Sequence, residues 1–314
     1  MDALRTVSLG KRYIRTWAVD HLTMTVAQGD IYGFVGRNGA GKSTFMKMVA
    51  GLSLPTEGSV EIFGEVVRPG ETSPRLGAII ENPGMHPNLS GFDNVMCRAI
   101  ALGTADPKAA SSDVLGFVGL SDVSNQRVKS YSLGMKQRLG LALALVGSPD
   151  LLLLDEPFNG LDPEGVRGIR NLIVQLNEVR GITVFISSHV LDQLERMVTR
   201  YGVIRGGRLV RELTAEEVER ECSDYLCIRS PEYQTALVVL ERARPDMTFT
   251  VIEDDSIRVE GLSSDEAGRI LAHAGVPVSA MFRHSRDIED YFVELMGDDP
   301  DWSDAIGRKE ARSA

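Results

Sequence analysis

The stretch GRNGAGKST, residues 36–44, decides the fold of this chain. It fits the pattern G-x-x-x-x-G-K-[ST], follows an apolar run and precedes a segment with helical spacing. Glycines let consecutive backbone N–H groups converge on phosphate oxygens, and the following helix presents its N-terminus to the anion. A chance match arises in on the order of one in a hundred chains of this length, and the strand–loop–helix context lowers that frequency further. The sequence therefore predicts a phosphate-binding loop.

The contacts expected of this loop divide between its backbone and two side chains. Lys42 is placed to reach the β- and γ-phosphates of a nucleotide, and the Ser43 hydroxyl is placed to ligate Mg²⁺. Backbone groups of the whole stretch would surround the phosphates. The remaining residues expected to bind nucleotide are therefore Gly36, Asn38, Gly39, Ala40, Gly41 and Thr44.

A second acidic motif, LLLLDEP at residues 151–157, is a buried strand that emerges into two adjacent carboxylates. In a protein with a phosphate loop, the first, Asp155, is placed to hold Mg²⁺ through water, and the second, Glu156, to polarise the attacking water. Strands that simply end in solvated acids are common. The phosphate loop upstream makes the catalytic interpretation the favoured one.

Strands and helices alternate around these motifs. We expect strands over residues 151–155 and 182–188, helices over 162–180 and 189–198, and a hairpin over 201–212 that turns at Gly206-Gly207. Residues 91–147 are mostly helical in pattern. This alternation predicts a largely parallel sheet covered on both faces, with an added antiparallel β part and a helical subdomain.

The pattern changes beyond about Thr214. Short strands alternate with helices in the order β-α-β-β-α-β-α, which suits a small ferredoxin-like α+β domain. We therefore expect a nucleotide-binding domain over residues 1–213 and an accessory domain over 214–298. The polar residues 299–314 are expected to form a disordered tail.

Composition excludes several classes of protein. The 314 residues carry a formal net charge of −10, so nucleic acid is not an expected partner. Three scattered cysteines are typical of free thiols in a reducing compartment. The N-terminus lacks the apolar stretch of a signal peptide, and no apolar run approaches the ~20 residues that span a bilayer. If this protein works at a membrane, another chain must supply the span.

The segment YSLGMKQRLGLALAL, residues 131–145, resembles the signature of the ATP-binding cassette (ABC) family, L-S-G-G-Q followed by a helix. The resemblance covers roughly residues 5–213. Ser132 and Gly134, the two positions that meet ATP in that family, are kept, whereas Leu133 and Met135 replace the other glycine and the glutamine. Ser132 can also cap the helix and aim its N-terminus at an anion. The resemblance implies a head-to-tail dimer, here a homodimer, that encloses two ATP molecules.

Other family elements follow in order. Tyr13 stands where an aromatic ring stacks on adenine, although the nearby Trp17 is an alternative. Asp162 is the last residue of the stretch NGLD, which follows Glu156. In the family, the loop at this position after the catalytic acid contacts the second subunit. His189 matches the switch histidine that contacts the γ-phosphate, the plain alternative being a surface histidine at a helix start.

Between the phosphate loop and the signature, the family places a glutamine at the end of a short strand. In the stretch LGAIIENPG, residues 76–84, that position holds Glu81, followed by a turn at Asn82, Pro83 and Gly84. Glutamine offers a donor and an acceptor, whereas an ionised glutamate is acceptor-only. Near Mg²⁺ the carboxylate would bind more strongly, and near phosphates alone it would repel. The plain alternative is a divergent loop whose acid faces water.

The glutamate and the SLGMKQR signature resemble one subgroup, the ATPases of bacitracin-type and lantibiotic-immunity exporters. The resemblance implies the ATP-hydrolysing subunit of an exporter that confers efflux of, or immunity to, peptide antibiotics or other amphiphilic drugs. ATP and Mg²⁺ would be its cofactors, and it would lie on the cytoplasmic face of a bacterial membrane, partnered by separate permease subunits. Residues 81–98 would pass the conformational change to those subunits, with Glu81, Glu156 and His189 acting in hydrolysis. Two alternatives remain open: a soluble ABC ATPase acting on DNA or ribosomes, and an importer ATPase. The accessory domain could be regulatory, dimerising or passive.

Overall fold

The computed structural model describes residues 1–81, 84–252, 255–284 and 287–297. The predicted tail, residues 299–314, lies outside the described residues, as do Asn82 and Pro83 of the predicted turn. The chain divides into two compact units. The first comprises Met1–Ala215 together with the segment from Leu295 onward, and the second comprises Glu216–Glu294.

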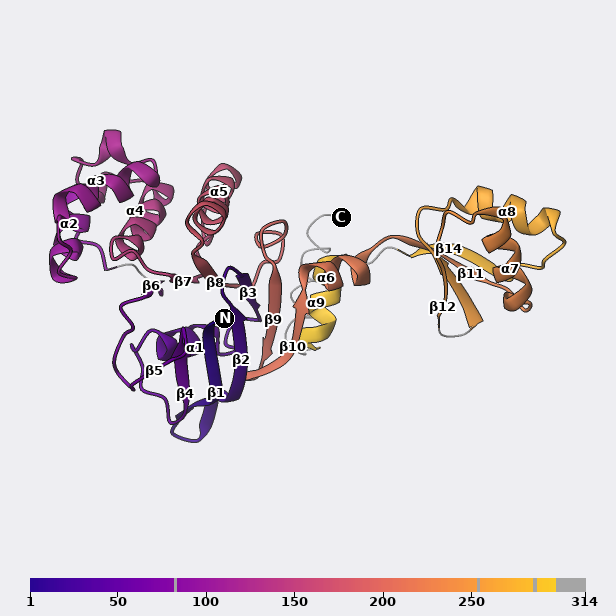
Figure 1. Cartoon of the computed structure of the whole chain (residues 1–314), viewed down its shortest axis with the longest axis horizontal. Coiled ribbons are helices and arrows are strands. Elements are labelled where there is room, and N and C mark those ends of the chain that lie inside the picture. Colours follow the sequence, from indigo (N-terminus) through magenta and orange to yellow (C-terminus); the bar gives the residue numbers. More distant parts are fainter. Residues whose placement is uncertain (82–83, 253–254, 285–286, 298–314) are drawn as a thin grey trace, which may run out of the picture. The chain divides into compact units, whose positions relative to one another are not determined.

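A six-stranded sheet forms the centre of the first unit, in the order β10-β9-β3-β8-β7-β6 (Figure 1). The neighbours from β9 to β6 pair in parallel, and the antiparallel pair β9–β10 turns at Gly206-Gly207 as predicted. Every residue of the central strands β3, β7 and β8 is buried, as expected of a sheet covered on both faces. The strands are β3 (Ile31–Val35), β6 (Leu76–Ile79), β7 (Leu151–Asp155), β8 (Thr183–Ser188), β9 (Arg200–Arg205) and β10 (Arg208–Thr214).

A second, antiparallel sheet of order β2-β1-β4-β5 shares the core of this unit. Its strands are β1 (Asp2–Tyr13), β2 (Thr16–Ala27), β4 (Glu57–Ile62) and β5 (Glu65–Val67). Leu4 and Ile62 of this sheet belong to one buried cluster with Phe34 of β3 and Phe45 of α1 (Lys42–Val49). The antiparallel sheet therefore packs on α1 and the parallel sheet, and this fixes the helix that follows the phosphate loop.

The helical segment forms a group of its own. Helices α2 (Gly91–Ala101), α3 (Pro107–Phe117) and α4 (Leu133–Leu145) lie together, with two short 3₁₀ turns, η1 (Ser121–Val123) and η2 (Val128–Ser130) (Figure 1). Helix α5 (Pro163–Arg180) follows β7. Each of α2 to α5 begins after a residue whose side chain accepts a backbone N–H of the first turn, which is the usual N-cap chemistry. These capping residues are Ser90, Asp106, Ser132 and Asp162.

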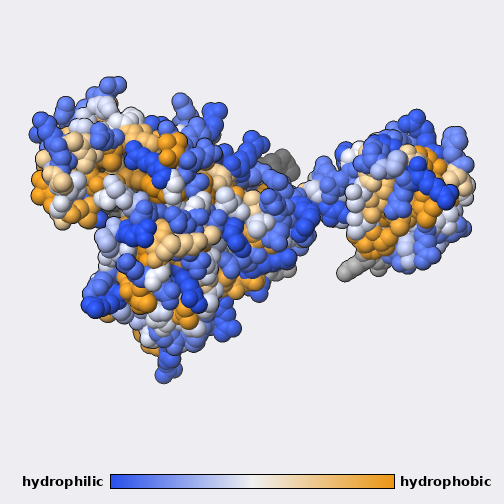
Figure 2. Space-filling view, in the orientation of Figure 1, coloured by the Kyte–Doolittle hydropathy of each residue, from blue (hydrophilic) through white to orange (hydrophobic). Residues whose placement is uncertain are grey.

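Apolar side chains remain exposed on the helical group. Figure 2 shows apolar surface over the α2–α4 part of the molecule, where the exposed large residues include Leu89, Ile100 and Leu102. Exposed apolar patches of this kind are typical of surfaces that bind another protein. None of the helices in the described ranges is both long enough and apolar enough to cross a bilayer.

The prediction of a helix over residues 189–198 is wrong. The described chain forms consecutive turns there, and Arg196 has a φ of 68° that a helix does not allow. The Arg170 guanidinium of α5 donates to the carbonyls of Asp192 (2.9 Å) and Gln193 (3.2 Å), which a helix would use internally. A contact from another element thus outweighs the helical spacing of the apolar residues.

The second unit is built on a four-stranded antiparallel sheet in the order β12-β13-β11-β14. Helices α7 (Tyr233–Ala243) and α8 (Ser264–His273) pack on one face and form a separate apolar core, which includes Leu226, Ile257, Leu240 and Leu271. This strand order confirms the ferredoxin-like prediction. The strands are β11 (Tyr225–Arg229), β12 (Phe249–Ile252), β13 (Ser256–Val259) and β14 (Ala280–His284). Helices α6 (Ala215–Cys222) and α9 (Ile288–Met296) each cross a boundary between the two units.

Candidate site for nucleotide binding and hydrolysis

The parallel sheet brings four of the predicted motifs to one edge. Strand β3 leads into the phosphate loop, β6 ends shortly before Glu81, β7 ends on Asp155, and β8 ends just before His189. Ligands of open α/β sheets bind beyond the carboxyl ends of the strands. Segments far apart in sequence therefore meet at the loop that the sequence analysis singled out.

The phosphate loop needs its glycines for conformation and for space. Gly39 and Gly41 have φ values of 82° and 109°, in the region that residues with a Cβ rarely adopt. A Cβ on Gly41 would collide with the Ala18 carbonyl oxygen, and one on Gly36 would lie 2.6 Å from the carbonyl oxygen of Ile204. Helix α1 begins at Lys42, and no side chain among the described residues caps it. Its first N–H groups are therefore available to an anion.

Lys42 is held at the start of α1 by oxygen atoms. Its side chain is 6% exposed, and its ammonium group donates to the carbonyls of Gly36 (2.6 Å) and Arg37 (3.3 Å). The same Nζ lies 3.4 Å from Oε1 of Glu156. Because an ammonium has three donors, these oxygens satisfy it while keeping it beside the loop.

One serine orients both acids of the second motif. The Ser187 hydroxyl, at the end of β8, donates to Oδ1 of Asp155 (2.6 Å) and accepts the backbone N–H of Glu156 (3.1 Å). Asp155 is 7% exposed, so this bond fixes a nearly buried carboxylate. Ser187 is not among the site residues predicted from the sequence. The sequence feature that could have indicated Ser187 is the pair of serines at the end of the apolar strand ITVFISS, just before His189.

Glu156 is shared between a lysine and a histidine. Its Oε1 faces Lys42, and its Oε2 lies 2.8 Å from Nδ1 of His189. The backbone of Glu156 has a φ of 48°, a conformation that costs a non-glycine residue about 1–3 kcal/mol and that clusters at functional sites. The side chain is 21% exposed, so water can reach it. Lys42, Glu156 and His189 thus form one connected group.

Glu81 contacts a residue that the sequence analysis did not consider. Its Oε1 lies 2.6 Å from Nζ of Lys47, on α1, and its backbone has a φ of 60°. Its side chain is 60% exposed. The proposed contact of Glu81 with Mg²⁺ stays a prediction.

The register of the first hairpin separates the two candidate rings for adenine. Arg12 pairs with Trp17, and Tyr13 pairs with Thr16, so Tyr13 and Trp17 lie on opposite faces of the hairpin. The Trp17 ring packs 5.3 Å from the His21 ring and beneath the Arg12 guanidinium, whereas Tyr13 is 52% exposed. This geometry favours Tyr13 for stacking on adenine, which remains a prediction.

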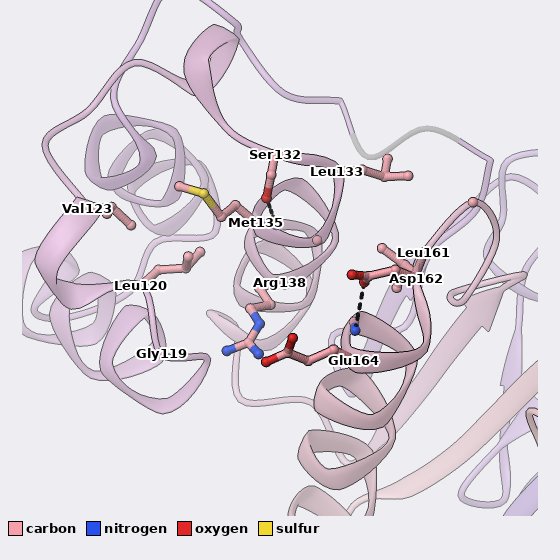
Figure 3. Close-up of a pocket in the computed structure, with 13 residues that line it drawn as sticks. Gly119, Leu120, Val123, Ser132, Leu133, Met135, Arg138, Leu161, Asp162 and Glu164 are labelled. Atoms are coloured by element: carbon pink, nitrogen blue, oxygen red, sulfur yellow. Dashed lines mark hydrogen bonds between the residues drawn. The ribbon is translucent and has the colours of Figure 1, made fainter.

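The signature segment and the loop that follows Glu156 line one pocket of about 590 Å³ (Figure 3). Ser132 caps α4 by accepting the N–H of Met135 at 3.3 Å, and Asp162 caps α5 by accepting the N–H of Gly165 at 2.9 Å. Gly134 also lines this pocket. None of the residues found to line this pocket belongs to the phosphate loop. Two helix N-termini therefore face a space separate from that loop.

Tyr131 anchors the start of the signature. Its hydroxyl donates to the Val123 carbonyl at 2.8 Å, and the ring is 4% exposed. Burial raises the pKa of the Tyr131 phenol, so it stays a neutral donor at physiological pH. The phenol thus ties the residue before Ser132 to the turn that follows α3.

Arg138 links three helices at the floor of the pocket. Its guanidinium donates to the Val118 carbonyl, at the end of α3, at 3.2 Å, and it points toward Glu164 of α5 (Figure 3). A Cβ on Gly119 would lie 3.0 Å from Nη1 of Arg138, and one on Gly168 of α5 would lie 2.7 Å from Nη2. Both glycines therefore leave room for the guanidinium. Arg138 joins the signature helix to α3 and to the helix that carries Asp162.

We predict that Gly168→Ala weakens nucleotide-dependent dimerisation about 3- to 10-fold. This corresponds to a loss of roughly 1 kcal/mol in the interaction between α4 and α5 through Arg138. The added methyl displaces the flexible tip of Arg138, while alanine itself favours the helix. Nucleotide binding by the single chain should not change. Analytical ultracentrifugation with and without nucleotide measures the dimer. Gly116→Ala is the matched control, because its new Cβ would meet only the Ser121 hydroxyl at 3.6 Å. Wild-type dimerisation by Gly168→Ala would contradict the prediction.

Sequence comparison places the chain among known transport proteins. Residues 19–159 match the family described as ABC transporter. The chain is 40% identical over 298 residues to the bacitracin transport ATP-binding protein BcrA of Bacillus licheniformis, a match that covers 94% of this chain and 97% of that protein. It is 38% identical over 209 residues to the lantibiotic transport ATP-binding protein SrtF of Streptococcus pyogenes, covering 67% of this chain and 90% of SrtF.

Solved structures agree on the fold. The dimeric ATP-binding cassette MJ0796 bound to ADP and Pi has a TM-score of 0.61 at 23% identity, covering 67% of this chain and 98% of the cassette. The ADP conformation of MJ1267, an ATP-binding cassette of an ABC transporter, has a TM-score of 0.64 at 22% identity. This match covers 70% of this chain and 94% of MJ1267. At these identities the likeness concerns the fold, and it confirms the fold predicted for the first unit.

Proposed function

Because the chain belongs to the ABC transporter family, as an ATP-binding and ATP-hydrolysing subunit, we propose that it powers the efflux of peptide antibiotics. Cargo passes through separate membrane subunits, to which this chain binds on the cytoplasmic face of a bacterial membrane. The observation that carries the cargo class is the similarity to BcrA over 94% of this chain. That match extends through the second unit, beyond residues 19–159 that match the family.

Three side chains of the site account for hydrolysis. We propose that the γ-phosphate of ATP draws the Lys42 ammonium away from Glu156, since phosphate oxygens are strong partners for a lysine. The freed Oε1 of Glu156 then accepts a proton from the attacking water. His189 keeps its contact with Oε2 and orients the carboxylate. Lys42 neutralises charge that develops on the phosphoryl oxygens.

The donor set fits Mg²⁺. Ser43, Asp155 and Glu81 offer hard oxygen donors at the ends of neighbouring elements. The described residues hold no group of three or more His, Cys, Asp or Glu side chains placed to bind a metal by themselves. This suits an ion that is held by one or two carboxylates together with substrate phosphates. Bound Mg²⁺ would supply positive charge at the phosphate oxygens.

A second copy of this chain completes the site in our proposal. Ser132 and Gly134 line a pocket apart from the phosphate loop of their own chain, and the α4 N-terminus would meet the ATP held by the partner. Asp162, on the rim of the same pocket, would contact the partner directly. ATP binding closes this dimer, and hydrolysis lets it open.

The coupling surface in this proposal runs from Glu81 along α2. The exposed apolar residues Leu89, Ile100 and Leu102 lie on or beside this helix and offer a docking surface to the membrane subunits. Glu81 follows β6, which pairs in parallel with β7, the strand that ends on Asp155. In this proposal, a movement of the membrane subunit against α2 is passed along the chain to Glu81.

The proposal predicts resistance to bacitracin. A sensitive bacterium that expresses this chain together with its membrane subunits should survive higher bacitracin concentrations. Expression of the Glu156→Gln variant in place of the native chain should not protect the bacterium against bacitracin. In proteoliposomes, bacitracin should raise the ATPase rate of the complex, whereas unrelated small drugs should not.

Two outcomes would contradict this proposal. If the chain co-purifies from detergent extracts with ribosomes or DNA and with no membrane protein, a soluble ABC ATPase is the better description. If ATPase activity rises only with cargo supplied from outside the cell, the complex is an importer.

A further inference from the structure

Lys47 and Ser43 lie on one face of the same helix. They are four residues apart in α1, a spacing that places side chains one above the other. Ser43 is in the first turn, next to Lys42 and the phosphate loop, and Lys47 is one turn further along. The face of α1 that presents the Ser43 hydroxyl therefore continues to the Lys47 ammonium.

Glu81 and the acids at the end of β7 follow neighbouring strands of one sheet. Strands β6 and β7 pair in parallel, and their last pair is Ile79 with Leu154. Glu81 and Glu156 each follow two residues after that pair, so both leave the sheet from the same end. The chain turns at Glu81, whose φ is 60°, and its carboxylate meets Lys47 at 2.6 Å.

Each of these two acids thus has its own lysine from α1. Glu156 lies 3.4 Å from the Lys42 ammonium, and Glu81 lies 2.6 Å from the Lys47 ammonium. Asp155 is a third acid at the same edge. Carboxylates beside one another and beside a triphosphate repel, unless a cation balances them. A glutamine at position 81 would need no such cation.

We infer that Lys47 is a positioning residue, the counter-charge that allows a carboxylate to work at position 81. The inference rests on the proposed role of Glu81 in hydrolysis and coupling. Lys47 holds the Glu81 carboxylate on the α1 face that leads to Ser43 and offsets its charge when a triphosphate binds. The Glu81 side chain is 60% exposed and the Lys47 side chain 32%, so a membrane subunit can act on the pair.

The pair contributes little to folding. Exposed ion pairs stabilise proteins by about 0.2–1 kcal/mol, and many contribute nothing measurable. A role in stability alone would therefore appear only as a small change in Tm. A role in positioning would instead change the affinity for nucleotide and the degree to which cargo stimulates ATP hydrolysis.

A double-mutant cycle tests the inference with wild type, Lys47→Gln, Glu81→Gln and the double variant. Binding of a fluorescent ATP analogue to the chain is measured with and without Mg²⁺. Lys47→Gln should weaken Mg²⁺-free binding about 3- to 10-fold, because Glu81 then faces the triphosphate unbalanced. Glu81→Gln should not weaken it. The double variant should recover wild-type affinity, since a neutral amide needs no counter-charge.

Independent effects of the two substitutions would overturn the inference, as would unchanged affinity in Lys47→Gln. Lys108→Gln, an exposed lysine of α3, is the control for losing one positive charge. In the complex with membrane subunits, the ratio of cargo-stimulated to basal ATPase rate should follow the same pattern. Failure of bacitracin to stimulate the wild type would count against the proposed cargo, while the binding cycle would still test Lys47.

Discussion

Glu156→Gln should lower the steady-state ATPase rate about 10²- to 10⁴-fold, the usual contribution of a general base. The amide keeps the shape of the side chain and still reaches His189, but it cannot take a proton from water. It also loses the charge that faces Lys42 at 3.4 Å, which leaves the ammonium free for the γ-phosphate. ATP binding should therefore persist while hydrolysis stops.

Size-exclusion chromatography with Mg²⁺-ATP measures the second consequence. Because hydrolysis opens the proposed dimer, the variant should elute at twice the mass of the chain, whereas the wild type should return to monomer as ATP is consumed. Glu178→Gln, an exposed acid near the end of α5, is the matched control and should behave as wild type. A persistent monomer in the variant, or near-normal turnover, would contradict the assignment of Glu156.

The position of Glu156 is consistent with the proposed role of this acid in hydrolysis. Its two oxygens face different partners, Lys42 and His189, and its backbone is held in a conformation that a non-glycine residue rarely adopts. The N–H of Glu156 is fixed by Ser187, which also fixes Asp155. Strain at this residue is maintained by bonds from β8, and this places the carboxylate within reach of both Lys42 and His189.

Local motifs could be predicted from the sequence because their chemistry is local. The glycines of the phosphate loop, the cap formed by Ser132 and the acids that end β7 depend on neighbours within a few residues. Alternation of strands and helices likewise indicated the parallel sheet, which brings these motifs to one edge. The arrangement of the site thus follows from sequence order and from the handedness and direction of the strands.

Contacts between distant segments could not be predicted. The Arg170 guanidinium donates to the carbonyls of Asp192 and Gln193, which would otherwise accept backbone hydrogen bonds in the helix that the apolar spacing favoured. The contact of Lys47 with Glu81 spans 34 residues, and that of Ser187 with Asp155 spans 32. In each case a side chain of ordinary type acquires its role from tertiary packing, which one sequence does not reveal.

Lys42→Met should weaken ATP binding about 100-fold, since a charge-assisted hydrogen bond contributes about 1.5–3 kcal/mol and Lys42 would make at least one to phosphate. Methionine fills the same space at a site that is 6% exposed, so the fold should be kept. Glu156 loses one partner but retains His189 and remains 21% exposed. The nucleotide-free protein should therefore unfold at nearly the wild-type temperature.

Thermal unfolding with ATP then separates the two proteins. At an ATP concentration of about 100 times the wild-type Kd, binding stabilises the wild type by about 2.7 kcal/mol, whereas a 100-fold weaker site gains about 0.4 kcal/mol. For a domain of this size the first value corresponds to a rise in Tm of about 5–11 °C, and the second to about 1–2 °C. Lys108→Met, on the exposed surface of α3, should show the full rise. A full rise in Lys42→Met would mean that the phosphate loop binds ATP through its backbone alone.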